Sequence, residues 1–358
     1  MTKKITYFKT STLTSSGYYL AGLDSIQNKF NFKLCHRSTI PERIKDGSTL
    51  FNSKTSNPNF SKSVRDRKPI PDFQHLFEVQ NQNTRFLFCI DGSDSAYSLN
   101  TSQLKRVKYY FKVNYNKDIL STIKDDILIE NMEKIHPINP LFPVRPKLSS
   151  LVLPPLDRDL KKTFSRFRKI IDMPDIDYLR KLRNIPKKWD VFFVLSYYNQ
   201  AHHQDKNQYR YKLMKHLKSC DDINSFVGFV GKDIPDAYSE FHLKRLKLKD
   251  YCKKLAQSRI GIYVEGLHNC LSYKLPTMMA LGLPIVGQNI KNNNKLMQNT
   301  FFKYQFSEDN PERIANKIRM LSKHPSLIND LGKQNANTFD KSLSPEMTMS
   351  QTLSFMKI

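Results

Sequence analysis

Residue types that can hold an anion gather in one stretch of the chain, residues 258–288, which reads SRIGIYVEGLHNCLSYKLPTMMALGLPIVGQ. Its apolar start predicts a buried strand, followed by a loop, a helix and a further strand. A helix that begins near Leu271 would present free N–H groups and a positive dipole end, which favour phosphate. The polar or permissive residues near that point are Glu265, Gly266, His268, Asn269 and Lys274. They suit a diphosphate, although an ordinary strand-to-helix turn has the same residue types.

Groups that can accept a proton follow the strands expected in the first half of the chain. The apolar run RFLFCID (85–91) ends in Asp91, and Asp94 lies in the polar loop that follows. His36 closes the strand expected at 30–36. A carboxylate or an imidazole at a strand end suits a general base. A structural role, such as capping a loop or a helix, is the commoner one for such residues and stays open for each of the three.

The elements around these residues have the rhythm of a doubly wound sheet. The expected strand–helix–strand units are 4–8, 18–26 and 30–36, then 85–91, 101–107 and 109–115. Ligands of such sheets bind beyond the carboxyl ends of the strands, where Asp91 and Asp94 fall. The segment 41–83 is polar and rich in Asn, Ser, Lys and Pro, and it predicts a long loop or a variable insert.

The second half alternates strands and helices throughout, which predicts a parallel αβα sandwich. Six prolines in residues 136–156 indicate a connection between two domains. We therefore expect two Rossmann-like αβα domains that face each other across a cleft. The expected divisions are 1–150, an N-terminal domain with the insert 41–83; 151–188, a linker with a basic helical segment; 189–342, a C-terminal domain; and 343–358, a tail that packs back on the N-terminal domain.

The composition sets limits on the class of protein. The 358 residues include 58 Lys and Arg against 33 Asp and Glu, a formal charge of +25, which predicts phosphate-rich partners. The five cysteines form no CxxC pair, so a disulfide framework or zinc ribbon is not expected. No apolar run reaches membrane-spanning length and the first residues lack a signal peptide's apolar core, so we expect a cytoplasmic protein. No P-loop, GxGxxG, HExxH or GxSxG motif occurs.

The stretch from the basic helix at 248–259 to the second strand resembles the C-terminal half of GT-B glycosyltransferases, especially the exostosin-like and bacterial polysaccharide or glycolipid sugar transferases. The residues that carry the resemblance are Arg259 to Gly266, His268, Lys274, Ala280, Gly282 and Pro284. The helix expected around 311–321 also resembles the end of that fold, so the likeness covers roughly 189–342.

The resemblance implies a hexosyl- or related transferase with a nucleotide-sugar donor held mainly by the C-terminal domain. Donor-binding roles are then implied for Arg210, for Gly231 and Lys232, and for the anion-binding residues of 258–288. Asp91, Asp94 or His36 would be the base that activates the acceptor. The resemblance implies no cofactor and no metal, because the helix dipole and the cations would stabilise the departing diphosphate. Lys274 stands where the family often has Arg, and Thr277 where it often has an acid.

Three functions are compatible with the sequence. The first is transfer of a sugar to a glycan, a glycoprotein or a lipid-linked acceptor, with the positive charge holding the protein on the inner face of an anionic membrane. The second is nucleic-acid binding, which the positive charge favours although no recognition motif is visible. The third is an inactive GT-B-like scaffold, which the missing acid at Thr277 would explain. We favour the first.

Overall fold

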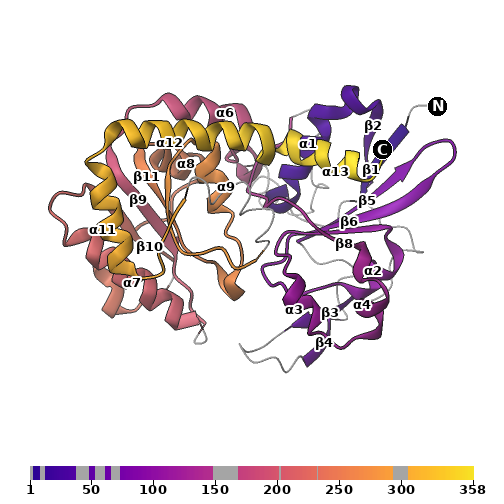
Figure 1. The fold of residues 1–358 in the computed structure, drawn as a ribbon, viewed down its shortest axis with the longest axis horizontal. Helices are drawn as coiled ribbons and strands as arrows, with labels where there is room; N and C mark the ends of the chain where they lie inside the picture. Colours follow the sequence, from indigo (N-terminus) through magenta and orange to yellow (C-terminus); the bar gives the residue numbers. More distant parts are fainter. Residues whose placement is uncertain are drawn as a thin grey trace.

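A computed structural model of the chain contains two α/β domains, each built on its own sheet (Figure 1). The structure describes residues 3–8, 13–37, 48–52, 61–65, 73–147, 168–200, 203–231, 233–292 and 305–358. The two sheets are rich in parallel strands, and helices lie against both. The α/β class expected from the sequence is confirmed.

The N-terminal sheet has the strand order β2-β1-β5-β6-β7-β8. Its strands are β1 (Lys3–Phe8), β2 (Phe32–Arg37), β5 (Gln74–Gln80), β6 (Arg85–Asp91), β7 (Tyr109–Lys112) and β8 (Ile135–Pro137). Only β5 among these six strands runs antiparallel to its neighbours. Helix α1 (Leu13–Phe30) covers one face through Tyr19 and Leu23. The other face is covered by α2 (Thr101–Arg106), α3 (Lys117–Ser121) and α4 (Asp126–Glu130).

The C-terminal sheet is parallel, in the order β10-β9-β11-β12-β13. Its strands are β9 (Trp189–Ser196), β10 (Ser225–Val230), β11 (Ser258–Tyr263), β12 (Ile285–Gly287) and β13 (Gln305–Ser307). Side chains alternate across a strand, so Val191 and Phe193 of β9 pack toward α7 (Gln204–Lys218) and α11 (Pro311–Ser322). Phe192 and Val194 pack toward α8 (Leu248–Ala256) and α9 (Lys274–Ala280) on the opposite face. The strand is therefore buried on both sides and forms a rigid base for the loop that follows it.

The end of the chain returns to the N-terminal domain. Helix α12 (Pro325–Thr338) leads through a π-helical turn at Phe339–Leu343 into α13 (Pro345–Phe355), which lies beside α1 (Figure 1). The hydroxyl of Tyr18 in α1 donates to the carbonyl oxygen of Leu343. Helix α6 (Ile176–Lys181) is held to the same turn by Arg180, whose Nε lies 3.1 Å from Oδ1 of Asp340. The two domains therefore share a continuous hydrophobic core where α13 packs on α1.

The expected loop at 41–83 is wrong in part. Residues 74–80 form β5, which pairs with both β1 and β6 inside the main sheet, and β3 (Ser48–Asn52) pairs with β4 (Ser61–Arg65). The strand β5 reads QHLFEVQ, and its polar residues interrupt the apolar run that would signal a buried strand. Gln74, His75 and Glu78 are nevertheless buried, and Glu78 has a partner on β6: Nε of Arg85 donates to its Oε1 at 2.9 Å. Residues 151–167 of the proposed linker 151–188 lie outside the described residues.

The packing of α13 on α1 can be tested at Gly22. A Cβ atom on this residue would lie 2.1 Å from the carbonyl oxygen of Pro345, a backbone atom. Alanine is favoured over glycine inside a helix by about 1 kcal/mol, but overpacking costs about 1–3 kcal/mol. We expect Gly22→Ala to lower the free energy of unfolding, measured with urea on the full chain.

Gly231→Ala is the matched control, since its Cβ would meet no atom closer than 3.5 Å. Its stability should stay within about 0.5 kcal/mol of the parent. A Gly22→Ala variant more stable than the parent would contradict this close packing of the two helices.

Candidate functional site

Loops from the carboxyl ends of both sheets meet where the two domains join. The loops that follow β6 and β7 contact the loop that follows β11. The backbone N–H of Leu271 donates to Oδ1 of Asn114 at 2.7 Å, and the thiol of Cys270 is hydrogen-bonded to the carboxylate of Asp94. This junction contains most of the residues that the sequence singled out, because parallel strands of one sheet end at one edge.

Glu265 is the centre of a cluster of cations at this junction. Its carboxylate is 5% exposed and lies 2.8 Å from Nζ of Lys291 and 3.5 Å from Nζ of Lys206. The guanidinium of Arg210 reaches the backbone oxygen of the same residue at 3.2 Å. A single negative charge is therefore surrounded by several positive ones, and the excess favours an anionic ligand.

Arg210 lies in α7 and joins the ends of two neighbouring strands. It donates from Nη1 to the carbonyl oxygen of Ser196 at 3.2 Å and from Nη2 to the hydroxyl of Tyr198 at 3.1 Å, in addition to the bond with Glu265. The guanidinium also lies over the ring of Tyr198, 4.3 Å from the ring centre. Arg210 is buried and fixed by these contacts. These contacts immobilise the guanidinium, so its positive charge has a defined place.

Lys274 begins α9 and turns its ammonium group inward. Nζ donates to the carbonyl oxygen of Val194 at 3.1 Å and lies over the ring of Tyr251. Burial lowers the pKa of the Lys274 ammonium well below its ordinary value, and the nearby charge of Arg210 lowers it further. The protein therefore holds two repelling cations side by side, which lowers its stability and favours binding of an anion.

The loop between β11 and α9 differs from the expected helix start. Residues Leu267–Asn269 form a short 3-10 turn in which His268 (φ 54°) and Asn269 (φ 57°) are left-handed. Helix α9 begins at Lys274, three residues later than expected, and its seven residues are short. The N–H of Leu271 is occupied by Asn114, so it is not free for a ligand.

This loop folds tightly on itself. A Cβ on Gly266 would lie 2.2 Å from Sγ of Cys270, so glycine is required there. The side chains of His268 and Asn269 are exposed, and the His268 ring lies edge-on to the ring of His203, with 5.8 Å between centres. Lys206 donates to Oδ1 of Asn269 at 3.3 Å. The loop therefore contacts Lys206 through Asn269 and His203 through His268.

Of the three proposed bases, Asp94 alone lies at this junction with solvent access. Burial raises the pKa of its carboxyl group, while the charge of His268 and the hydrogen bond from Cys270 oppose the shift. Asp91 is 0% exposed, and its Oδ2 accepts from the hydroxyl of Tyr110 at 2.5 Å, so the structure favours a structural role.

His36 lies away from the junction. Its strand β2 is three strand positions from β6 in the sheet order, which is about 14 Å at the usual strand spacing. The register places His36 beside Tyr7, in line with Phe88, three residues before the end of β6. His36 is therefore not brought together with Asp94.

Two proposed donor-binding residues follow β10, and three residues that the sequence did not single out lie at the junction. Gly231 follows β10, an outer strand of the sheet, and Lys232 lies outside the described residues. The sequence analysis missed Lys206, Lys291 and Asn114. Asn114 and Lys291 follow the ends of β7 and β12 within four residues, so the strand-end rule contained their signal. Lys206 lies in the first turn of α7, the helix after β9.

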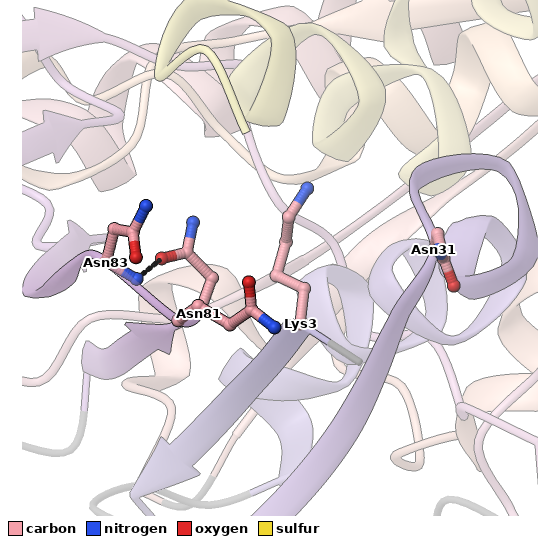
Figure 2. Close-up of a pocket in the computed structure, with 5 residues that line it drawn as sticks. Lys3, Asn31, Asn81 and Asn83 are labelled. Atoms are coloured by element: carbon pink, nitrogen blue, oxygen red, sulfur yellow. Dashed lines mark hydrogen bonds between the residues drawn. The ribbon is translucent and has the colours of Figure 1, made fainter. Parts of the chain in front are cut away.

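Two cavities on the described part of the protein lie elsewhere. One, of about 250 Å³, is lined by Lys3, Asn31 and residues 81–83, at the opposite edge of the N-terminal sheet (Figure 2). Figure 2 also shows Asn81 accepting a hydrogen bond from the backbone of Asn83. The other, of about 820 Å³, lies between α1, α6 and α13. Among the described residues, no three His, Cys, Asp or Glu side chains gather as a metal site requires.

No protein-family model and no curated protein matches the sequence. In fold, the chain is similar to WaaG, a glycosyltransferase involved in lipopolysaccharide biosynthesis, at 10% identity over 68% of this chain and 62% of that chain, with a TM-score of 0.40. It is also similar to the T4 phage enzyme BGT with its UDP-glucose substrate, at 12% identity, 75% and 88% coverage and a TM-score of 0.35.

The chain is further similar to S. aureus TarM, in a complex with UDP, at 9% identity, 93% and 89% coverage and a TM-score of 0.38. The chain spans less than two thirds of WaaG. At TM-scores below 0.5 these are likenesses of fold only, so any activity has to be inferred from the residues at the junction.

The buried charge of Lys274 predicts a measurable effect on stability. Because folding lowers its pKa, the unfolded chain binds this proton more tightly, and stability should rise with pH up to the ordinary Lys value near 10.5. Lys274→Met keeps the length and removes the charge. We expect it to raise the free energy of unfolding at pH 7 by about 1–2 kcal/mol and to flatten the rise toward high pH. Urea unfolding at a series of pH values measures both effects.

Lys212→Met, at an exposed position of α7, is the control and should change neither quantity. A Lys274→Met protein that is less stable at pH 7, with an unchanged pH profile, would show that this ammonium group is not a destabilising charge.

Proposed function

We propose that this protein is a glycosyltransferase, which moves a sugar from a nucleotide-sugar donor to a glycan, glycolipid or protein acceptor. One observation carries the proposal: Lys206 and Lys291 bind the carboxylate of Glu265, Arg210 binds its backbone oxygen, and Lys274 lies close enough to Arg210 to be repelled by it. Asp94 lies across the junction from this excess of positive charge, hydrogen-bonded to Cys270. A nucleoside diphosphate has the charge to balance the cations, and an acceptor hydroxyl needs a base such as Asp94. The resemblance in residues 189–342 implies the same arrangement, with the donor held by the C-terminal domain and the base supplied by the N-terminal domain.

In the proposed reaction, Asp94 of the N-terminal domain acts on the acceptor and the cations of the C-terminal domain act on the donor. The acceptor oxygen attacks C1 of the sugar while the bond from C1 to the diphosphate breaks. Asp94 takes the hydroxyl proton, and the leaving diphosphate keeps the bonding electrons next to the cations. Arg210 suits this role because its place is fixed before the ligand arrives. Since the cations neutralise the leaving group, we propose that the reaction needs no metal and continues in the presence of EDTA.

A panel of UDP-, GDP-, ADP- and CMP-sugars tests the donor. One of them should raise the melting temperature, since a ligand at a hundred times its Kd adds about 2.7 kcal/mol. Replacing Lys206 and Lys291 together by Gln should abolish the shift. Asp94→Asn should keep the shift and lower kcat by about 10²–10⁴-fold. In the parent enzyme, kcat should rise with pH through a pKa above the ordinary Asp value of 3.8, because the base must be ionised.

Lys212→Gln, on the exposed surface of α7, is the control for lost charge and should retain both the shift and the rate. If no nucleotide sugar changed the melting temperature, the donor site would be wrong, and an inactive scaffold would be the better account. If Asp94→Asn reacted as fast as the parent, Asp94 would not be the base.

A second charged region concerns the place where the protein acts. Six basic side chains, which we call the basic face, lie on α8 and the segment before it: Lys244, Arg245, Lys247, Lys249, Lys253 and Lys254. Asp250 is the one acid between them, and none of the six forms a salt bridge with an acid of the described chain. Lys249 and Lys253 are one helical turn apart and repel each other. Six positive charges within eleven residues, with one acid among them, suit an anionic surface.

We propose that the basic face holds the protein on the anionic inner leaflet of a membrane, where a lipid-linked acceptor would lie. None of the helices in the described ranges is both long and apolar enough to cross a bilayer. Binding would then be peripheral and electrostatic, at about 1 kcal/mol for each basic residue near the surface. A nucleic-acid partner shares the same chemistry and is the alternative.

Vesicle binding distinguishes these partners. Replacing the exposed Lys247 and Lys253 by Gln should weaken binding to phosphatidylserine vesicles about 30-fold, the factor that about 2 kcal/mol gives. Lys212 and Lys215, which lie on α7 across the same sheet, are the matched pair for control and should have little effect. Tight, salt-dependent binding to duplex DNA without binding to vesicles would favour nucleic acid instead.

A further inference from the structure

A buried polar network lies directly beneath the loop that carries Asp94. Lys112, at the end of β7, is 0% exposed, and its ammonium group has three partners. It donates to Oγ of Ser93 at 2.9 Å and to the carbonyl oxygen of Ser98 at 2.7 Å, and it lies 3.5 Å from Oδ2 of Asp91. Since a lysine has three N–H donors, all of them are used inside the protein. The Lys112 ammonium group therefore has no N–H left for a ligand, and its bonds fix the loop.

Ser93 is the point at which this network holds the loop. Its backbone N–H donates to Oδ1 of Asp91 at 2.9 Å, and its hydroxyl accepts from Lys112. Both ends of the loop are thus tied to buried charges, because Ser98 is bound to the same ammonium group. Asp94 is the next residue after Ser93, so its backbone is held from one side while its carboxylate faces the other domain.

Asn114 connects this arrangement to the C-terminal domain. Its side chain is 2% exposed and uses both of its polar atoms. Nδ2 donates to the carbonyl oxygen of Ser93 at 2.8 Å, and Oδ1 accepts from the backbone N–H of Leu271 at 2.7 Å. One amide therefore binds the residue before Asp94 in one domain and the residue after Cys270 in the other. Asp94 and Cys270 are themselves hydrogen-bonded to each other.

We infer that Asn114 is a positioning residue, which holds Asp94 at a fixed distance from the loop 266–271, with Lys112 fixing the Asp94 loop from below. The inference deepens the proposed function, because it assumes that Asp94 is the base and that 266–271 lies on the donor side. Burial makes the two bonds of Asn114 strong and costly to leave unmade. A displacement of about 1 Å at a reacting group can lower a rate about 100-fold, so this amide would control the rate without touching either substrate.

Hydrogen exchange tests the bridge without reference to any activity. In the parent protein, the N–H of Leu271 should be protected although it lies outside every helix and strand. In Asn114→Ala, exchange in the peptides that cover 92–99 and 266–273 should rise about tenfold. Asn116→Ala is the matched control. Asn116 also reaches the other domain, but through longer contacts of 3.4 Å to the backbone of Lys291 and to Asn292. Its side chain also caps α3, which neither peptide covers, so its loss should leave exchange in both peptides unchanged.

Kinetics then test the role in positioning. With the donor found in the panel above, Asn114→Ala should lower kcat about 100-fold and leave the donor KM within about twofold, whereas a merely destabilised fold would also change KM. Asn114→Gln, which keeps the carbonyl oxygen and the NH2 of the amide, should recover part of the rate.

Fast exchange at Leu271 in the parent, or equal exchange in Asn114→Ala and the parent, would overturn the inference whether or not an activity is found. An unchanged kcat in Asn114→Ala would also overturn it. If exchange responded as expected but no nucleotide sugar were bound or turned over, the proposed function would fail while the bridge between the domains would stand.

Discussion

The carboxylate of Glu265 balances the cations on the C-terminal side of the domain junction. Lys206 and Lys291 lie within 3.5 Å and 2.8 Å of it, and Arg210 binds its backbone oxygen. Without this acid, the cations and nearby Lys274 would repel one another in a region of low solvent access. With it, an excess of positive charge remains. Burial lowers the pKa of Lys274, and the charge of Arg210 lowers it further, so an anion beside these two groups would relieve their repulsion.

Rigid elements hold this unfavourable arrangement in place. The strand β9 is packed on both faces, so the loop that leads to Arg210 begins from a fixed point. The left-handed residues His268 and Asn269 persist because Gly266 and Cys270 close the loop tightly around them. Two consecutive left-handed residues and the repelling pair Arg210 and Lys274 therefore lie together at the domain junction. Such a distribution is typical of sites that bind and react.

The two domains are joined on both sides of the molecule by different means. Behind the junction, α13 packs on α1 with apolar contacts and the bond from Tyr18 to Leu343. In front, polar contacts dominate, chiefly those of Asn114 and Asp94 with the loop before α9. Apolar packing is insensitive to small shifts in direction, whereas hydrogen bonds need defined distances. The back therefore keeps the domains together, and the front sets the positions of individual side chains.

The sequence by itself determined the elements and the chemistry available at their ends. Apolar runs such as 85–91 and 189–196 were recognisable as buried strands because the signal lies in their own apolar side chains and does not depend on residues elsewhere in the chain. The strand β5 was not, because its polar residues find partners on other strands. Only the tertiary structure decided which strand ends meet. It brought Asp94 to Cys270, left His36 apart, buried Asp91 with Lys112, and added Lys206, Lys291 and Asn114 to the junction. Spacing along the chain cannot reveal such pairs, because the contacts depend on how two sheets are placed relative to each other.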